Sequence, residues 1–232
     1  VGGFAGYLSN SAINNSFAIG AVTGDYFVGG LVGYFSDSII NSSFATGAVT
    51  GNSFVSGLVG VSYSSVITHS YWAVDTTGIS STSVSAATLA ELQCPVSGND
   101  TSCVVDQTLY AEWDSGVWDF GTSSQLPGLI LSGTTYRDSD GDGSLDEDDD
   151  FPSNRAASVD SDRDGHPDTW TLGCKKECIA DSGLALDQFP NSAAAWQDGD
   201  LDGYPDSWAD DCDSSCQASS DLTLDGYPND ID

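Results

Sequence analysis

"VGGLVGYFSDSIINSSFATGAVTGNSF" (residues 28–54) lies between two stretches that resemble it closely. VGGFAGYLSNSAINNSFAIGAVTGDYF occupies residues 1–27 and VSGLVGVSYSSVITHSYWAVDTTG occupies residues 55–78, so the copies begin 27 residues apart. Glycine, isoleucine, serine and aromatic residues recur at the same positions of the three copies. A period of this length is typical of proteins that stack one structural unit on the next.

Each copy alternates short β-forming runs with turn residues. Runs such as LVGYF and INSSFATG are separated by Gly, Ser and Asn, without a helical period. Three strands of about five residues and three turns fill about 27 residues, the length of one coil of a parallel β-solenoid, or β-helix. A leucine-rich repeat has a similar length, but its Leu-x-x-Leu-x-Leu pattern is missing. We therefore predict an all-β fold: a parallel β-solenoid of 27-residue coils, a capping segment, and a loop-rich region after them.

Two apolar columns are predicted to point into the coils. Stacking brings equivalent residues to the strand spacing of about 4.8 Å, so the side chains of one column touch. The columns are Phe4, Leu31 and Leu58, and Ile13, Ile40 and Ile67.

The repeat also resembles a known motif. GGLVGYFSDSIINSSFATGAVTG is similar to the GLUG motif of bacterial secreted and surface proteins, which include adhesins. The resemblance covers residues 1–78 and implies a place on the bacterial cell surface or in its matrix. The third copy departs from the motif at His69 and Trp72, which indicates the last coil before a cap.

Residues 79–136 are predicted to form the capping segment. Thr88 and Glu91 are spaced as a capping box for one short helix, and EWDSGVWDFG and LPGLIL are predicted strands. In GLUG proteins a similar Tyr-Trp, Ala-Glu-Leu-Gln and Trp-Asp-Phe series follows the repeats. The resemblance implies that three tryptophans close the open core: Trp72, Trp113 and Trp118.

The charge of the chain excludes several classes of partner. Its formal net charge is −30, and its five basic residues all lie at or after Arg137. Such a surface repels nucleic acid and anionic lipid. No apolar run approaches the roughly 18 residues of a membrane span. We therefore expect no nucleic-acid binding and no direct membrane insertion.

The six cysteines fall into three close pairs, Cys94 with Cys103, Cys174 with Cys178, and Cys212 with Cys216. In a loop-rich acidic chain these predict local disulfides and an oxidising compartment. Zinc is the rival interpretation, but zinc sites show more converging Cys or His. The chain has no methionine and no leader, and Val1 starts in phase with the repeat. We therefore expect a piece of a longer precursor, with further coils or another subunit stacked before Val1.

Residues 137–232 carry an acidic pattern with a fixed spacing. Of the 35 acidic residues, 26 lie here, and Asp-x-Asp-x-Asp-Gly-x-x-Asp occurs three times. Ca²⁺ takes six to eight oxygen ligands, and alternating carboxylates on a chain bent at glycine converge on one ion. Position seven offers a backbone carbonyl, and position nine binds directly or through water. The predicted ligands are Asp138, Asp140, Asp142, Ser144 and Asp146; Asp160, Asp162, Asp164, His166 and Asp168; and Asp198, Asp200, Asp202, Tyr204 and Asp206.

These stretches depart from EF-hands. The acid expected at position twelve is Asp149 in the first stretch but Thr171 and Ala209 in the others, and no amphipathic helices flank them. A second period of 38 residues places an Asp-x-aromatic-Pro corner at Asp149, Asp187 and Asp225. The missing ligands must therefore come from elsewhere in the chain, and these three corner aspartates are the candidates.

The combination resembles the thrombospondin type 3 repeat, whose acidic loops wrap calcium ions and are held by disulfides. The resemblance covers residues 138–232 and implies that Asp149, Asp187 and Asp225 are cross-loop calcium ligands. The unit of 38 residues and the cysteine placement differ from that family, which leaves the number of ions open. An acidic surface without bound metal is the alternative, but such a surface does not need this regular spacing.

Together these features predict a non-enzymatic, secreted calcium-binding protein of the bacterial surface or matrix. A rigid solenoid and a calcium-stiffened stalk would serve adhesion, or would join head to tail into a filament. A glycan-binding module that uses Tyr7, Tyr34 and Tyr63 is one alternative. A β-helix enzyme acting on polysaccharides is another, although the coils contain only three acids and one histidine: Asp25, Asp37, Asp75 and His69.

Overall fold

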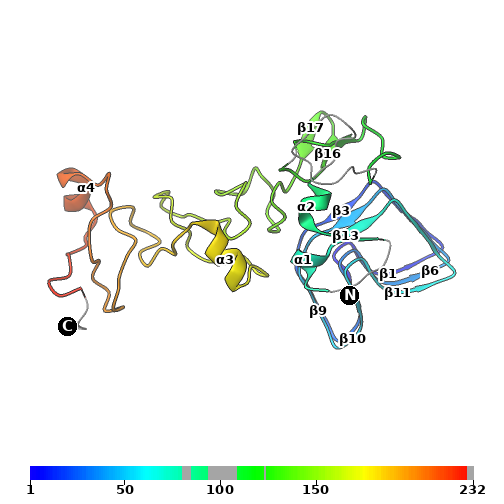
Figure 1. Cartoon of the computed structure of the whole chain (residues 1–232), viewed down its shortest axis with the longest axis horizontal. Coiled ribbons are helices and arrows are strands. Elements are labelled where there is room, and N and C mark those ends of the chain that lie inside the picture. Colours follow the sequence, from blue (N-terminus) through cyan, green and yellow to red (C-terminus); the bar gives the residue numbers. More distant parts are fainter. Residues whose placement is uncertain (80–84, 94–108, 123, 229–232) are drawn as a thin grey trace.

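The structure is a computed structural model that describes residues 1–79, 85–93, 109–122 and 124–228. Of these residues, 27% lie in strands and 10% in helices, and most strands lie in parallel sheets. This is consistent with the all-β, solenoid-like class that the repeats predict. Figure 1 shows the repeat segment (residues 1–79) at one end and the acidic segment (residues 137–228) leading away from it to the C-terminus.

The strand pairing confirms the predicted period of 27 residues. Tyr7 pairs with Tyr34, Ile13 with Ile40, and each partner lies 27 residues further along. The first copy contains β1 (Ala5–Ser9), β2 (Ala12–Asn14), β3 (Phe17–Ala18), β4 (Val22–Thr23) and β5 (Tyr26–Gly29). The second contains β6 (Val32–Ser36), β7 (Ile39–Asn41), β8 (Phe44–Ala45), β9 (Val49–Thr50) and β10 (Ser53–Ser56). The third contains β11 (Val59–Tyr63), β12 (Val66–Thr68) and β13 (Tyr71–Ala73).

The expected three strands per copy are wrong, since the first two copies have five each. The reason is the number of corners. Asn10, Asn15 and Phe27 all adopt positive φ in the first copy, and Asp37, Ser42 and Phe54 do so in the second. Residues other than glycine adopt this left-handed conformation rarely, so the sequence marks these corners poorly. Asn10 and Asn15, like their counterparts Asp37 and Ser42, lie between strands and interrupt runs that composition alone would continue, whereas Phe27 and Phe54 lie within β5 and β10.

A serine ladder ties the copies together. The Ser38 hydroxyl donates to the carbonyl of Ser36 and accepts from the backbone N–H of Ser11, 27 residues earlier. Ser43 acts in the same way on Ser16, and Ser70 on Ser43. This gives a physical reason for serine at the same position of each copy, because a buried hydroxyl needs a partner.

The interior of the copies is apolar. Leu31, Phe35 and Ile40 are fully buried, and Trp72 joins the same cluster. A Cβ at Gly57 would lie 1.9 Å from the Trp72 ring, so only glycine fits there. The predicted inward position of Phe4 is wrong, because 56% of it is exposed. Phe4 lies in the first copy, where no described strand covers its outer side.

The middle segment covers a side of the repeats. The third copy ends in α1 (Val74–Thr77). The described elements of the middle segment, which is the predicted capping segment of residues 79–136, are β14 (Ala86–Ala87), α2 (Leu89–Leu92), β15 (Trp118–Asp119), β16 (Gly128–Leu131) and β17 (Thr134–Tyr136). The capping box of Thr88 and Glu91 is confirmed. Trp113 and Trp118 do not close the interior as expected, but pack outside it against Phe44. The aromatic side chains of β3 and β8 point outward and need this cover.

The acidic segment is mostly irregular. Its described residues include two short helices, α3 (Lys176–Ser182) and α4 (Ser214–Ser219), and no strand. Cys174–Cys178 and Cys212–Cys216 form disulfides next to these helices. The third predicted pair, Cys94 with Cys103, lies outside the described residues. Among those residues, no helix has the length and apolar character needed to cross a membrane.

Candidate metal centres

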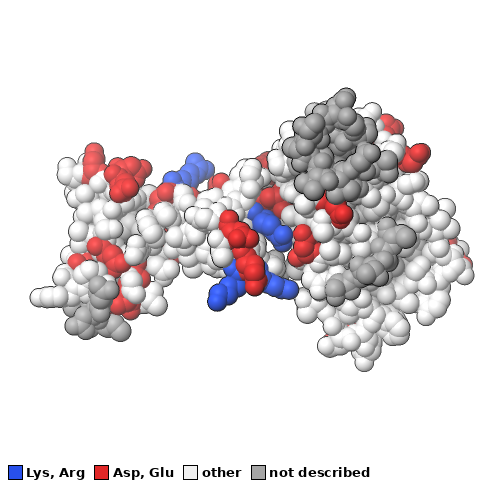
Figure 2. All heavy atoms as spheres, in the orientation of Figure 1, with Lys and Arg blue, Asp and Glu red and all other residues white. Residues whose placement is uncertain are grey.

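Three aspartate triplets are each gathered around one point. In loop 1 (residues 138–146), loop 2 (160–168) and loop 3 (198–206), one oxygen from each of three carboxylates lies within 4.8 Å of the others. Each group could hold a metal ion. Figure 2 shows the acidic side chains in patches along this segment, whereas the visible face of the repeats is almost free of charge. The triplets are Asp138, Asp140 and Asp142; Asp160, Asp162 and Asp164; and Asp198, Asp200 and Asp202.

The first aspartate of each loop shapes the turn. One Asp138 oxygen accepts a hydrogen bond from the N–H of Gly141 at 2.8 Å, and the other accepts from Gly143 at 3.0 Å. Asp160 and Asp198 accept from the equivalent backbone groups of loops 2 and 3. The sixth residue is a glycine with φ between +89° and +107°, a conformation that a side chain would strain. The chain therefore curls around its own carboxylates.

The ninth aspartate closes the loop. Asp146 accepts from both the backbone N–H and the hydroxyl of Ser139, each at 2.7 Å. Asp168 engages Ser161 in the same way, and Asp206 accepts from the N–H of Gly199. In each loop a hydrogen bond therefore joins the residue at position two to the carboxylate at position nine. Their direct contact with a metal ion stays a prediction.

The third and fifth aspartates carry oxygens that nothing in the protein satisfies. Asp142 Oδ1 accepts from the N–H of Ser144, whereas its Oδ2 is buried without a partner. Asp140 is only 5% exposed, and its Oδ2 also lacks a partner. A buried carboxylate oxygen without a hydrogen bond or counter-ion is costly, so these oxygens fit a bound cation. The same holds for Asp162 Oδ2, Asp164 Oδ2, Asp202 Oδ2 and both oxygens of Asp200.

Two corner aspartates, Asp187 and Asp225, lie near carboxylates of loops 2 and 3, and their role as metal ligands stays a prediction. Asp187 is 4% exposed, its Oδ1 accepts from the N–H of Phe189, and its Oδ2 has no partner. Burial, together with the charges of the nearby Asp164 and Asp162, raises its pKa to about 6. Asp225 Oδ2 is likewise buried without a partner, and its charge acts on Asp200 of loop 3. Each of loops 2 and 3 therefore has a fourth carboxylate from a distant part of the chain.

Loop 1 takes its fourth carboxylate from its own neighbourhood. The charge of Asp149 raises the pKa values of Asp140 and Asp142, which places it beside the triplet. Burial is the larger cause, and it raises the pKa of Asp138 to about 7, of Asp140 to about 8 and of Asp142 to about 6. These carboxyls repel one another and lack solvent, which is the situation that a divalent cation relieves.

The seventh residue of each loop holds the fifth aspartate through its backbone N–H, and metal binding by its carbonyl stays a prediction. The N–H groups of Ser144, His166 and Tyr204 each donate to the fifth aspartate of their loop. The His166 ring lies against the carbonyl of Ala185 and stacks on Trp196 at 4.1 Å between ring centroids. The ring thus links loop 2 to the residues before loop 3. The sequence had given no indication of a role for Trp196.

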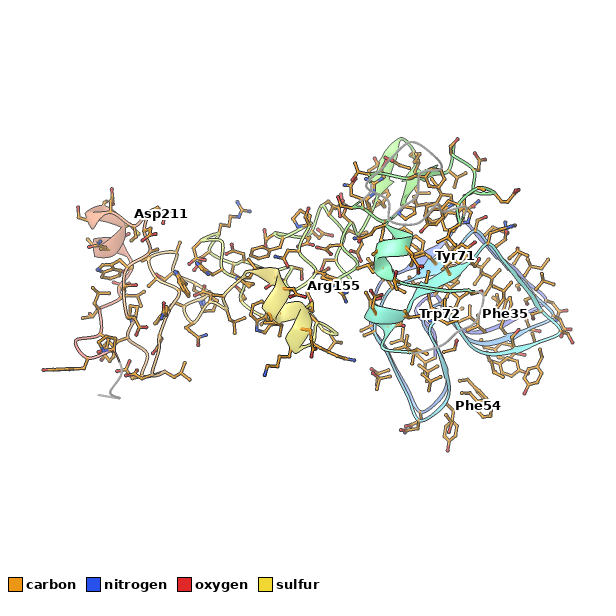
Figure 3. All side chains as sticks on the ribbon, viewed as in Figure 1. Phe35, Phe54, Tyr71, Trp72, Arg155 and Asp211 are labelled. Carbon is orange, nitrogen blue, oxygen red and sulfur yellow. A yellow bond between two sulfur atoms is a disulfide. The ribbon has the colours of Figure 1, made fainter. Side chains whose placement is uncertain are left out.

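Arg155 is a second residue whose place the sequence did not indicate. Its charge lowers the pKa of Asp142, which burial raises, and its Nε is buried without a partner. Figure 3 labels Arg155 where the acidic segment meets the rest of the chain. It lines a small cavity with Thr46 of the repeats, more than 100 residues away. No spacing rule could have connected these two positions.

The donor set favours a hard cation. Every side-chain donor in the three triplets is a carboxylate oxygen. The four cysteines of the acidic segment are engaged in disulfides, so they offer no thiolate for zinc. The same disulfides favour an oxidising compartment.

Comparisons with known proteins add no identity. No protein-family model matches the chain, and no curated protein or solved structure is significantly similar to it.

Proposed function

We propose that this chain is a secreted, non-enzymatic, calcium-binding structural protein of a bacterial surface or matrix. In this proposal a parallel β-solenoid formed by residues 1–79 is joined to a stalk that calcium stiffens. The observation that carries it is the set of buried Oδ2 atoms without a partner at the third and fifth aspartates of the loops and at the corner aspartates Asp187 and Asp225. Three equivalent loops carry them, so we expect three ions.

Calcium fits these loops better than magnesium does. Each centre has three loop carboxylates, and the charge of one corner carboxylate acts on it. The seventh residue of each loop would add its backbone carbonyl. Ca²⁺ accepts many protein oxygens in flexible geometry, whereas Mg²⁺ keeps several waters and binds one or two carboxylates. Extracellular modules bind calcium with dissociation constants of about 10⁻⁴ to 10⁻³ M, so these loops would fill outside a cell.

The acidic segment has almost no apolar core to stabilise its fold. The three apolar clusters of the described residues contain no side chain beyond Leu129. The buried apolar residues of the acidic segment are small: Ala156, Ala157, Ala194, Ala195 and Cys212. A region without an apolar core must obtain its folding energy from elsewhere, and metal binding supplies it only to the folded state. Calcium would therefore determine whether the stalk is stiff.

The solenoid would act as a rigid body on this stalk. Its support is the repeated parallel register and the fully buried interior. The adhesive role is supported by the resemblance of residues 28–54 to the GLUG motif. Head-to-tail assembly would use the outer strand edges of β1 and β11, each of which pairs only with β6 among the described strands.

The packing of the tyrosines bears on the glycan-binding alternative. The rings of Tyr7 and Tyr34 lie 5.1 Å apart and 7° from parallel. Tyr34 and Tyr63 are also neighbours, at 5.6 Å. Sugars stack on exposed ring faces. Tyr34 lies between the other two rings, whereas Tyr7 is 66% exposed and Tyr63 54% exposed, so ring surface for a sugar remains only at the ends of this row. The arrangement favours packing between coils.

The acids of the coils have local partners, which speaks against the polysaccharide enzyme. Asp25 accepts from the Asn52 amide at 2.9 Å, and Asp75 accepts from the N–H of Leu89 at 2.8 Å. His69 is an exposed corner residue beside Asn41. A glycosidase needs two carboxylates facing one sugar, about 5 to 10 Å apart. The local roles of Asp25 and Asp75 favour structural assignments.

Calorimetric titration with calcium, together with metal analysis of the dialysed protein, tests the proposal. We expect about three ions per chain, consistent with the three triplets. Light scattering with calcium and after chelation separates a filament subunit from a monomeric adhesin. A chain that binds no calcium at millimolar concentration would overturn the proposal.

A further inference from the structure

We propose that the first metal centre is a joint: calcium in loop 1 fixes the acidic segment against the rest of the chain, whereas the ions of loops 2 and 3 act within the acidic segment. The inference rests on the proposed calcium binding and assigns one of the three centres a separate task. It follows from how differently the three loops are surrounded.

Loop 1 is bound by the middle segment at Ser139, between its first two ligands. The Ser139 carbonyl accepts from Gln93 Nε2 at 2.8 Å and from the backbone N–H of Leu126 at 3.2 Å. Its hydroxyl lies 3.2 Å from Gln125 Nε2. The ligands Asp138 and Asp140 therefore flank a residue that belongs to the interface. A change in the position of either ligand must move that residue.

The glycines of the loops show the contrast most directly. A Cβ at Gly141 would lie 2.7 Å from the Leu89 side chain, and one at Gly143 would lie 3.2 Å from the carbonyl oxygen of Ile19. Loop 1 is thus pressed between α2 and the repeats. At Gly165 of loop 2 and Gly203 of loop 3, a Cβ would meet nothing within 4 Å. Within the part of the chain that the structure describes, loop 1 is therefore the one loop whose glycines press against the repeats and α2.

A second contact reinforces the joint. Arg155 Nε and Thr46 Oγ1 are both buried without a partner, and both line a cavity of about 10 Å³ together with the ligand Asp142. That volume accommodates about one water molecule. Nearby, a Cβ built on Gly173 would lie 3.3 Å from the side chain of Ala48 in the repeats. Figures 1 and 3 show the acidic segment meeting the repeats in this region.

Loss of calcium would act on the joint through charge. Asp138, Asp140, Asp142 and Asp149 would repel one another without an ion, and the loop would open. Because Ser139 lies within the loop, its hydrogen bonds to the middle segment would weaken. Linkage is reciprocal, so contacts that hold the joint must also strengthen calcium binding at loop 1.

Two matched substitutions test this in the full chain. Asp140→Asn and Asp200→Asn each neutralise the third aspartate of a loop, one in loop 1 and one in loop 3. We expect each variant to bind one calcium ion fewer by calorimetry. Small-angle X-ray scattering in calcium should show a broadened distance distribution between the two halves only for Asp140→Asn. Protease cleavage near residues 137–150 should increase for that variant alone.

The outcomes separate the two levels of the proposal. If both variants lose one ion and their scattering curves remain alike, the joint is overturned and the calcium proposal stands. If neither variant loses an ion, the calcium proposal fails, and the joint fails with it. If the distance distribution broadens for Asp140→Asn and stays unchanged for Asp200→Asn, the joint is supported.

A reciprocal experiment leaves every ligand intact. Gln93→Ala removes the donor to the Ser139 carbonyl, and we expect one of the calcium dissociation constants to rise about tenfold. Gln217→Ala is the control, because Gln217 Nε2 donates to the Cys212 carbonyl within the acidic segment. The Gln217→Ala variant should leave the calcium dissociation constant of loop 1 unchanged. Equal titration curves for Gln93→Ala and the wild type would contradict the joint even if Asp140→Asn did not fold.

Discussion

The backbone N–H of Asp187 donates a 2.9 Å hydrogen bond to the carbonyl of Pro167, next to the last aspartate of loop 2. The N–H of Asp225 makes the same bond to Pro205 at 3.0 Å in loop 3. In both cases the corner aspartate returns to a loop whose first aspartate lies 27 residues earlier. The intervening residues carry a disulfide and a short helix (Figure 1). A cation bound at this point would close that stretch of chain, and closing a long flexible stretch removes much of its unfolded-state entropy.

The corner carboxylate is expected to be essential for the second centre. Asp187→Asn should weaken calcium binding at loop 2 by about tenfold or more, because the number of charged ligands sets the affinity. Asp181→Asn is the control: it removes the same charge from an exposed site on α3. Calorimetric titration of both variants measures the difference. Equal affinities for the two variants would show that Asp187 is not a ligand.

Chelation should unfold one half of the molecule and spare the other. The apolar clusters end at Leu129, so removal of calcium leaves the interior around Phe35 and Ile40 intact. At a hundredfold excess over the dissociation constant, each ion stabilises the folded state by about 2.7 kcal/mol. Hydrogen exchange in a chelator should therefore be fast for residues 137–228 and slow in β6 and β7. Uniform protection in both halves would show that the acidic segment folds without metal.

The calcium-free acidic segment should lose stability as the pH rises from about 4 to about 8. Burial, followed by neighbouring carboxylates, raises the pKa of Asp140 from 3.8 to about 8, and burial raises that of Asp138 to about 7. In this range the folded loop binds more protons than the unfolded chain, so the free energy of unfolding falls with increasing pH. Hydrogen exchange of residues 137–228 in calcium-free buffer, corrected for the intrinsic pH dependence of exchange, measures how the small folded population changes with pH. A stability that rises over this range would contradict the shared environment of the triplet.

Calcium binding should show the opposite dependence on pH. Protons and calcium compete for the same oxygens, so the affinity of loop 1 should increase up to about pH 8. Each proton released on binding can be counted by calorimetry in buffers of different ionisation enthalpy. Binding without proton release at pH 6 to 7, a range set by the raised pKa values of Asp142 and Asp138, would contradict this prediction.

Regular spacing made much of this molecule predictable. The pairing of Ile13 with Ile40 follows from a 27-residue period, because stacked copies must present equivalent residues to one another. The triplets and the proximity of Asp187 to loop 2 follow in the same way from the aspartate spacing. The five strands per copy did not follow, because Asn10 and Asn15 separate strands with positive φ and no glycine marks these positions.

The contacts of the acidic segment with the middle segment and with the repeats could not be predicted from the sequence. Gln93 and Ser139 lie 46 residues apart, and neither belongs to a repeat that could place them together. Arg155 and Thr46 share a cavity wall for reasons of packing alone. The sequence also does not predict that Asp146 accepts a hydrogen bond from Ser139. An aspartate at position nine has the same place in the pattern whether it binds a metal ion or closes the loop by accepting a hydrogen bond. These are the contacts on which the proposed joint depends.

The interior of the repeats provides the sharpest test of the fold, because two adjacent isoleucines of β7 face opposite ways. Ile40 is fully buried, whereas Ile39 is 48% exposed. Ile40→Ala should lower the free energy of unfolding of the repeat segment by about 2–5 kcal/mol through lost burial and a cavity. Ile39→Ala should change it by no more than about 0.5 kcal/mol. Denaturant unfolding followed by tryptophan fluorescence measures both, and neither variant should alter the calcium titration. A shift of one residue in register would exchange the two faces of the strand, so a larger effect for Ile39→Ala would overturn the stacking described here.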